Sequence, residues 1–176
     1  MKFVRLALIA FLLLLVFGTL VVNLVTAPEW RVEKSVLVRA EPARVAEFAA
    51  ELRNWPRFLP PDVGGAAVEY TFGAETRGNG ASAAIRSANG DATLRFVRCD
   101  AASIDYEVAF PGGANALENT LAWQREGELT RVTLRERAPV GWNPIARLLR
   151  GVIEEVTGRE VQNCLERLKE LPDCSV

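Results

Sequence analysis

The residues best suited to chemistry in this sequence lie close to its end, in an alternating run that predicts a β-strand. Val132, Leu134 and Glu136 share one face of this strand, because successive side chains of a strand point to opposite sides. A carboxylate on that apolar face would be buried, and burial raises its pKa, so that it can act as an acid, a base or a ligand anchor. The alternative is a solvated Glu136 beside Arg135 and Arg137 at the end of the strand.

Asn119 is the second polar candidate, since it shares its parity with the apolar Leu117 and Leu121 and is expected to face the same interior. Aromatic and aliphatic side chains occupy further positions that should face inward. Each of them taken singly most simply fills the core, but as a set they suit the wall of an apolar pocket with few polar groups. The candidate ligand-binding lining consists of Trp55, Phe58, Tyr70, Phe96, Tyr106, Asn119, Trp123, Glu136 and Val156.

Residue types that are missing narrow the chemistry further. The chain has no histidine, which excludes Ser–His and Cys–His nucleophile pairs and zinc sites with imidazole ligands. Cys99, Cys164 and Cys174 lack CxxC spacing and are interpreted as buried or loop thiols rather than metal ligands. The net charge of -1 leaves no basic face for nucleic acid. We therefore assign no catalytic residue and expect no metal, no cofactor and no nucleic-acid partner.

Near the N-terminus, residues 6–25 form an apolar run whose only polar members are Thr19 and Asn23. As a helix this run would reach about 30 Å, the thickness of the hydrocarbon core of a bilayer. Lys2 and Arg5 precede the run, so the positive-inside rule places the N-terminus in the cytoplasm. The rest of the chain is then expected on the extracytoplasmic, periplasmic side of the cell membrane.

A cleaved signal peptide is the alternative, because Val25-Thr26-Ala27 loosely fits the small-residue pattern of a cleavage site. The apolar run is longer than an ordinary signal-peptide core, and cleavage would leave Pro28 as the first residue, so we favour the uncleaved anchor. Either interpretation exports the rest of the chain. The sequence predicts an N-terminal transmembrane signal-anchor, residues 1–27, and one folded domain, residues 28–176.

The exported part begins with short, well-delimited elements. Residues 30–39 alternate between apolar and polar and predict a strand. Pro42 can begin a helix, and Val45 and Phe48 have the spacing of its buried face. Residues 54–61 contain too many prolines for a long helix, so a short helical turn and a loop are expected.

The middle of the chain has the pattern of an antiparallel meander. Turn signals such as Asn79-Gly80 and Gly127 recur roughly every ten to thirteen residues between alternating apolar runs. About six strands joined by hairpins follow from this spacing. Together with the first strand they form a twisted sheet that curls, and its concave face can grip a helix.

The final long element is predicted as one helix from Asn143 to Leu171, with Asn143 as its N-cap. Its apolar residues form two stripes, and Gly151 and Gly158 lie where the stripes change over, so a bend is expected there. The first stripe contains Ile145, Leu148, Leu149, Val152 and Val156, and the second contains Ile153, Val161, Cys164, Leu168 and Leu171. The predicted fold class is α+β, a curved antiparallel sheet of about seven strands wrapped round a long C-terminal helix and preceded by a single transmembrane helix.

This order of elements resembles the SRPBCC superfamily, the helix-grip fold of START-related lipid-binding and polyketide cyclase/dehydrase-like domains. It is most similar to the bacterial branch with one N-terminal membrane segment. The resemblance covers about residues 28–171. It rests on framework segments, namely Trp30-Arg31-Val32-Glu33-Lys34-Ser35, Ala40-Glu41-Pro42-Ala43-Arg44-Val45, Leu52-Arg53-Asn54-Trp55-Pro56 and Leu165-Glu166-Arg167-Leu168-Lys169.

Three functions are compatible with these features. We favour a membrane-anchored binding module that holds a hydrophobic small molecule or lipid in a cavity between the sheet and the C-terminal helix. The alternative is a cyclase or dehydratase-type enzyme that uses a cavity carboxylate such as Glu136. A protein-interaction module of the cell envelope is the second alternative. An apolar cavity of several hundred Å³ is expected for the first function.

Overall fold

Seven antiparallel strands form one curved sheet, as the sequence predicts. The structure is a computed structural model that describes residues 2–25, 27–63, 66–88, 90–112, 116–141 and 143–175. The strand order across the sheet is β1-β9-β8-β7-β6-β5-β4. The strands are β1 (Glu29–Val38), β4 (Glu69–Phe72), β5 (Ser82–Ser87), β6 (Gly90–Cys99), β7 (Ser103–Ala109), β8 (Leu117–Glu126) and β9 (Leu129–Pro139). A separate two-stranded sheet, β2 (Asp62–Val63) and β3 (Ala66–Ala67), follows residues 54–61, the segment expected to be a short helical turn and a loop.

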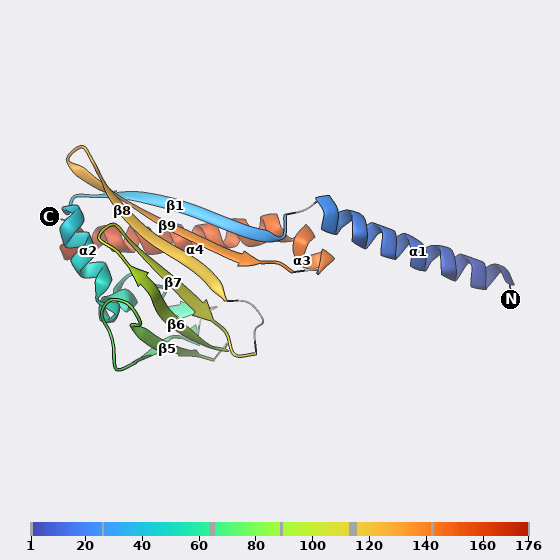
Figure 1. The fold of residues 1–176 in the computed structure, drawn as a ribbon, viewed down its shortest axis with the longest axis horizontal. Helices are drawn as coiled ribbons and strands as arrows, with labels where there is room; N and C mark the ends of the chain where they lie inside the picture. The colour runs from blue at the N-terminus through green and yellow to red at the C-terminus, as the bar shows by residue number, and fades with distance from the viewer. Residues whose placement is uncertain are drawn as a thin grey trace.

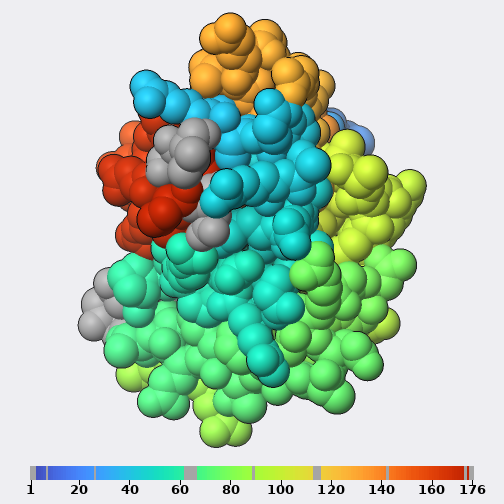
Figure 2. All heavy atoms as spheres, turned by 90° about the vertical axis from the view of Figure 1, so that its left-hand side faces the viewer, coloured from blue at the N-terminus to red at the C-terminus, as the bar shows by residue number. Residues whose placement is uncertain are grey.

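Two short helical elements close one end of the domain. α2 (Pro42–Ala50) buries Val45 and Phe48, and η1 (Leu52–Arg57) follows it as a single 3-10 segment. The C-terminal helix α5 (Pro172–Ser175) contacts α2, and the carbonyl of Cys174 accepts hydrogen bonds from the backbone N–H groups of residues 39 and 40. Figure 2 looks onto this end, where α2 and η1 lie between the C-terminal residues and the strands of the middle of the chain.

The long helix α4 (Arg150–Glu170) runs along β1 on one face of the sheet (Figure 1). Gly158 allows the close approach, because a Cβ atom at this position would lie 3.3 Å from Cε of Lys34 and 3.8 Å from Cγ1 of Val32. The carboxylate of Glu154 accepts a hydrogen bond of 3.2 Å from the backbone N–H of Arg31. The helix therefore covers the edge of the sheet that β1 would otherwise expose.

The predicted single helix from Asn143 to Leu171 is divided in the structure. A short helix α3 (Pro144–Leu148) precedes α4, and the backbone departs from helical geometry at Leu149, with ψ 0°. The N-cap is confirmed, because Oδ1 of Asn143 accepts hydrogen bonds from the N–H groups of Ile145 and Ala146. The interruption comes two residues before Gly151, at a leucine that gives no sequence signal for it.

The two apolar stripes of this segment have different surroundings. Val161 of the second stripe and the neighbouring Leu165 are buried, whereas Val152 and Val156 of the first stripe are at least half exposed. Each exposed valine precedes a buried residue by nine positions, which is about two and a half turns, so the two pairs project from opposite sides of α4. The sheet therefore buries the second stripe and leaves the first uncovered.

At the N-terminus, α1 (Lys2–Val25) projects from the domain, and its far end lies well away from the strands (Figure 1). Within the described part of the chain it is the one helix long and apolar enough to cross a membrane. α1 contacts α3, and Nη1 of Arg147 donates a 2.7 Å hydrogen bond to the carbonyl of Asn23. The same guanidinium donates from Nε to the carbonyl of Gly141.

Val161→Ala and Val152→Ala remove the same two methyl groups from opposite sides of α4. We expect Val161→Ala to lower the free energy of unfolding by about 2 kcal/mol, because it leaves a cavity in the core. Val152→Ala should change it by less than about 0.5 kcal/mol. Urea unfolding of the full chain in detergent micelles measures both. Equal losses for the two variants would show that α4 is not held through the Val161 side.

Candidate functional site

Polar side chains form a row across the inner face of the sheet, where α4 packs. Tyr106 on β7 is directly opposite Asn119 on β8, and Asn119 is directly opposite Glu136 on β9. Val32 on β1 completes the row beyond Glu136. Residues opposite one another in antiparallel strands have Cβ atoms about 5 Å apart, so the three polar groups converge. We call Tyr106, Asn119 and Glu136 the polar row.

Glu136 is partly buried, and burial raises its pKa to about 7. The inward orientation expected from strand alternation is therefore the one found, in place of the solvated alternative. The neighbouring Arg135 and Arg137 point to the other face, where they form ion pairs with Glu33 and Glu118. Neither of these two arginines therefore neutralises the charge of Glu136. Its carboxyl group titrates close to neutral pH.

Asn119 and Tyr106 are equally buried, each with 4% of its surface exposed. Nδ2 of Asn119 donates a 3.3 Å hydrogen bond to the carbonyl of Leu117, whereas Oδ1 has no hydrogen-bond partner among the described residues. A buried oxygen without a donor costs about 1–3 kcal/mol. The oxygen is therefore poised to accept a hydrogen bond from a donor that enters the site.

Besides Glu136, three titratable side chains of the interior have raised pKa values, namely Tyr106, Cys164 and Tyr70. Burial raises the pKa of Tyr106 well above its usual value, and the negative charges of Glu136 and Cys164 raise it further. Burial raises the pKa of Cys164 on α4 to about 12, with Glu136 adding to the shift. Burial, and then Cys164, raise the pKa of Tyr70 to about 12. These groups are therefore neutral at physiological pH and offer hydrogen-bond donors rather than charges.

Four of the predicted lining aromatics pack against one another. The ring centroid of Trp55 lies 4.7 Å from that of Tyr106, 4.8 Å from that of Phe96 and 5.4 Å from that of Phe58. Nε1 of Trp55 donates a 2.8 Å hydrogen bond to the carbonyl of Ala49, which fixes η1 against α2. These rings fill the interior beside the polar row and hold Tyr106 in place.

The other three predicted lining residues lie further from this cluster. Trp123 is buried four residues along β8 from Asn119, and its Nε1 donates to the carbonyl of Ala101. Tyr70 stacks on Phe72 at the far edge of the sheet, with 6.4 Å between ring centroids. Val156 is half exposed on α4. Sequence reasoning did not select Cys164, although its place in the second apolar stripe was the signal for its burial.

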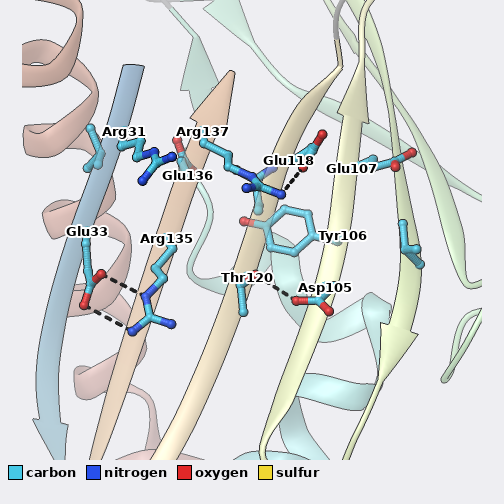
Figure 3. A pocket seen from close by; sticks show the side chains of 13 residues that line it. Arg31, Glu33, Asp105, Tyr106, Glu107, Glu118, Thr120, Arg135, Glu136 and Arg137 are labelled. Atoms are coloured by element: carbon cyan, nitrogen blue, oxygen red, sulfur yellow. Dashed lines mark hydrogen bonds and ion pairs between the residues drawn. The ribbon is translucent and has the colours of Figure 1, made fainter. Parts of the chain in front are cut away.

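A groove of about 680 Å³ follows the outer face of the sheet (Figure 3). Members of the polar row border it, but strand alternation directs their side chains to the opposite face. Charged residues of the outer face line the groove, including the ion pairs Arg135–Glu33, at 2.8 Å, and Arg137–Glu118. A second hollow, of about 740 Å³, lies at the surface of α2 and η1. Both of these hollows are outside the space between the sheet and α4, so neither of them is the apolar cavity expected there.

The chemistry available at the polar row is that of neutral donors and acceptors. Among the described residues, no group of three or more Cys, Asp or Glu side chains is arranged to hold a metal ion. A carboxyl group with a pKa of about 7 can give or take a proton near neutral pH. The row can therefore orient a polar group of an otherwise apolar molecule.

A seven-stranded antiparallel sheet that grips a long C-terminal helix defines an SRPBCC-type, helix-grip domain. The family assignment follows from the sequence: residues 29–171 match the family described as "Polyketide cyclase / dehydrase and lipid transport". The chain belongs to this family. The resemblance seen in its framework segments is thereby confirmed.

Solved structures share the fold at low sequence identity. Protein CV1439 from Chromobacterium violaceum has a TM-score of 0.59 and 14% identity, over 82% of this chain and 98% of that one. The di-domain ARO/CYC StfQ from the steffimycin biosynthetic pathway has a TM-score of 0.60 and 12% identity, over 80% of this chain and 50% of that one. Norcoclaurine synthase from Thalictrum flavum in complex with dopamine and hydroxybenzaldehyde has a TM-score of 0.58 and 9% identity, over 84% and 90%. Among curated proteins, no match was found.

The raised pKa of Glu136 makes stability depend on pH. Between its ordinary pKa and about 7, the unfolded chain loses this proton while the folded chain retains it, so Glu136 destabilises the fold increasingly as pH rises. We expect the free energy of unfolding of Glu136→Gln to equal that of the wild type near pH 4. At pH 8 it should be higher than that of the wild type by on the order of 3 kcal/mol. Urea unfolding at the two pH values measures this difference.

Glu118→Gln is the matched control, because Glu118 lies on the outer face of the adjacent strand, opposite Arg137. It should gain no stability at pH 8. A Glu136→Gln curve parallel to the wild type from pH 4 to pH 8 would mean that the Glu136 carboxyl group titrates normally.

Proposed function

We propose that the protein is a membrane-tethered binding module that holds a hydrophobic small molecule or lipid between its sheet and α4. The observation that carries this proposal is the unpartnered Oδ1 of Asn119, buried beside a carboxyl group whose pKa burial raises to about 7. Folded proteins rarely leave such groups without partners unless a ligand or water completes them. The family description, which includes lipid transport, supports the same class of ligand.

The chemistry of the row selects a particular kind of ligand. Asn119 offers an acceptor, Tyr106 offers a donor, and Glu136 offers a donor in its protonated form. A mainly apolar molecule with a hydroxyl and a carbonyl group on neighbouring atoms can satisfy all three. Because Trp55, Phe96 and Tyr106 are in contact, the apolar body of the ligand does not lie among these rings. It would instead separate α4 from the row on the side of Tyr70 and Cys164.

Asn119→Leu tests this proposal by removing the buried amide at nearly constant size. The full chain is extracted from its native membrane into nanodiscs, and compounds that travel with it are identified by native mass spectrometry. We expect the wild type to retain a mainly apolar compound and Asn119→Leu to retain about tenfold less, the cost of one lost hydrogen bond to a buried group.

Thr120→Val is the matched control on the same strand. Thr120 points to the outer face, where its hydroxyl donates to Asp105 at 2.7 Å. This variant should retain as much compound as the wild type. A wild type that carries no compound, or equal retention by Asn119→Leu, would remove the proposal.

An enzymatic function is the second candidate, and the pKa of Glu136 favours it. A general acid–base works best with a pKa near the operating pH, and the pKa of Glu136 is about 7. In a dehydratase, the Glu136 carboxyl group would protonate a leaving hydroxyl of the ligand and its carboxylate would remove a proton from the adjacent carbon. The products are an alkene and water, and Glu136 ends with its proton restored.

Mass spectrometry of the retained compound separates binding from this reaction. If the protein is a dehydratase, Glu136→Gln should retain a compound heavier by one water than the compound retained by the wild type. Identical compounds in both proteins would exclude dehydration by Glu136 and leave the binding module.

A further inference from the structure

One end of the helical layer carries an apolar surface that none of the described residues covers. Its members are exposed side chains of α3, of the residue that separates α3 from α4, and of the first turn of α4. Leu148, for example, is 67% exposed. We define the apolar surface as Ile145, Leu148, Leu149 and Val152.

The same side of α4 becomes polar further along the helix. Val152 and Val156 are followed, at alternating steps of three and four residues, by Arg159, Asn163 and Glu166, all exposed. These positions lie above one another on one side of a helix. The apolar character is therefore confined to the end of the helix that adjoins α3.

The apolar end of α4 adjoins the C-terminal end of α1. Nη1 of the buried Arg147 donates to the carbonyl of Asn23, two residues before the end of α1. This contact places α3 beside the C-terminal end of α1 (Figure 1). Only residues 26–28 separate α1 from β1, so the sheet also begins close to the end of α1.

We propose that Ile145, Leu148, Leu149 and Val152 are inserted into the interface of the bilayer that α1 spans. The proposal rests on the membrane anchor of the proposed function. The headgroup region on each side of the hydrocarbon core is about 5–8 Å thick, and α3 together with the first turn of α4 extends over that depth at the helical rise. Asn163, about three turns beyond Val152, then lies in water.

A second copy of the chain is the competing occupant, since spacings of three and four residues also suit helix pairing. A paired helix would be expected to keep its apolar stripe along its whole length. Here the apolar stripe is confined to the part of α4 nearest to α1. Insertion into a bilayer would require this arrangement, whereas pairing with a second helix would not.

Spin-label accessibility in the full chain distinguishes these environments. Leu148→Cys and Asn163→Cys are made in a Cys99→Ala background, because Cys99 is the one cysteine of the described chain that is not buried. Both labelled positions are exposed, so the label should not disturb the fold. The protein is reconstituted into phosphatidylcholine–phosphatidylglycerol vesicles. Collision rates are then measured with oxygen, which concentrates in lipid, and with a water-soluble nickel chelate.

At position 148 we expect a severalfold higher oxygen-to-nickel collision ratio than at position 163. High nickel accessibility at both positions would overturn the proposal and would place the apolar surface in water. Low accessibility to both reagents at position 148, with dipolar broadening between labels, would overturn it in favour of a second copy.

Failure of the membrane anchor itself gives a different result. In that case the full chain would remain in the aqueous fraction when the vesicles are floated on a density gradient. Flotation with high nickel accessibility at position 148 would refute docking while leaving the anchor intact.

Discussion

The close packing of α4 on β1 is the constraint on which the remaining features depend. At Gly158 a Cβ atom would lie 3.3 Å from Cε of the flexible Lys34 side chain, which is slightly tight, and at an ordinary contact distance of 3.8 Å from Cγ1 of Val32. Val32 is also the residue opposite Glu136, so the same contact places α4 over one end of the polar row. Were the helix to lie further out, Glu136 would be hydrated and its pKa would return to the ordinary range. The register of one helix against one strand thus determines the electrostatics of the site.

The polar row represents a cost that the rest of the core has to offset. The amide oxygen of Asn119, buried without a donor, loses hydrogen bonds that water would supply, and burial of Glu136 disfavours its charged form. The rings of Trp55 and Phe96 stabilise the row from one side and restrict the motion of Tyr106. The aromatic side of the site is therefore ordered before a ligand arrives, whereas the proposed ligand would have to move α4 away from the row.

How far the sequence predicts this site depends on how local the determining contact is. Asn119 lies opposite Glu136 because a two-residue turn, Gly127 and Glu128, joins β8 to β9, so this pairing follows from turn length and alternation. Tyr106 lies opposite Asn119 across a longer connection, whose length does not define the register. Cys164 joins the site only through packing of the helix on the sheet, which no local pattern encodes. Strand alternation predicted that Phe96 faces inward but could not distinguish a filled core from the wall of a cavity.

The polar row lies near the end of the strands that adjoins α1. Val32 is three residues from the first residue of β1, a distance of about 10 Å, and β1 begins where α1 and α3 meet the domain. The opposite end is covered by α2, η1 and the C-terminal residues (Figure 2). A ligand that reaches Glu136 by the shorter route therefore enters from the end next to α1. With α1 in a bilayer, as proposed, this route would have a physical advantage for a mainly apolar molecule. A transfer from the bilayer to the proposed site would expose little of its surface to water, and each Å² kept from water lowers the free energy of the path by about 25 cal/mol.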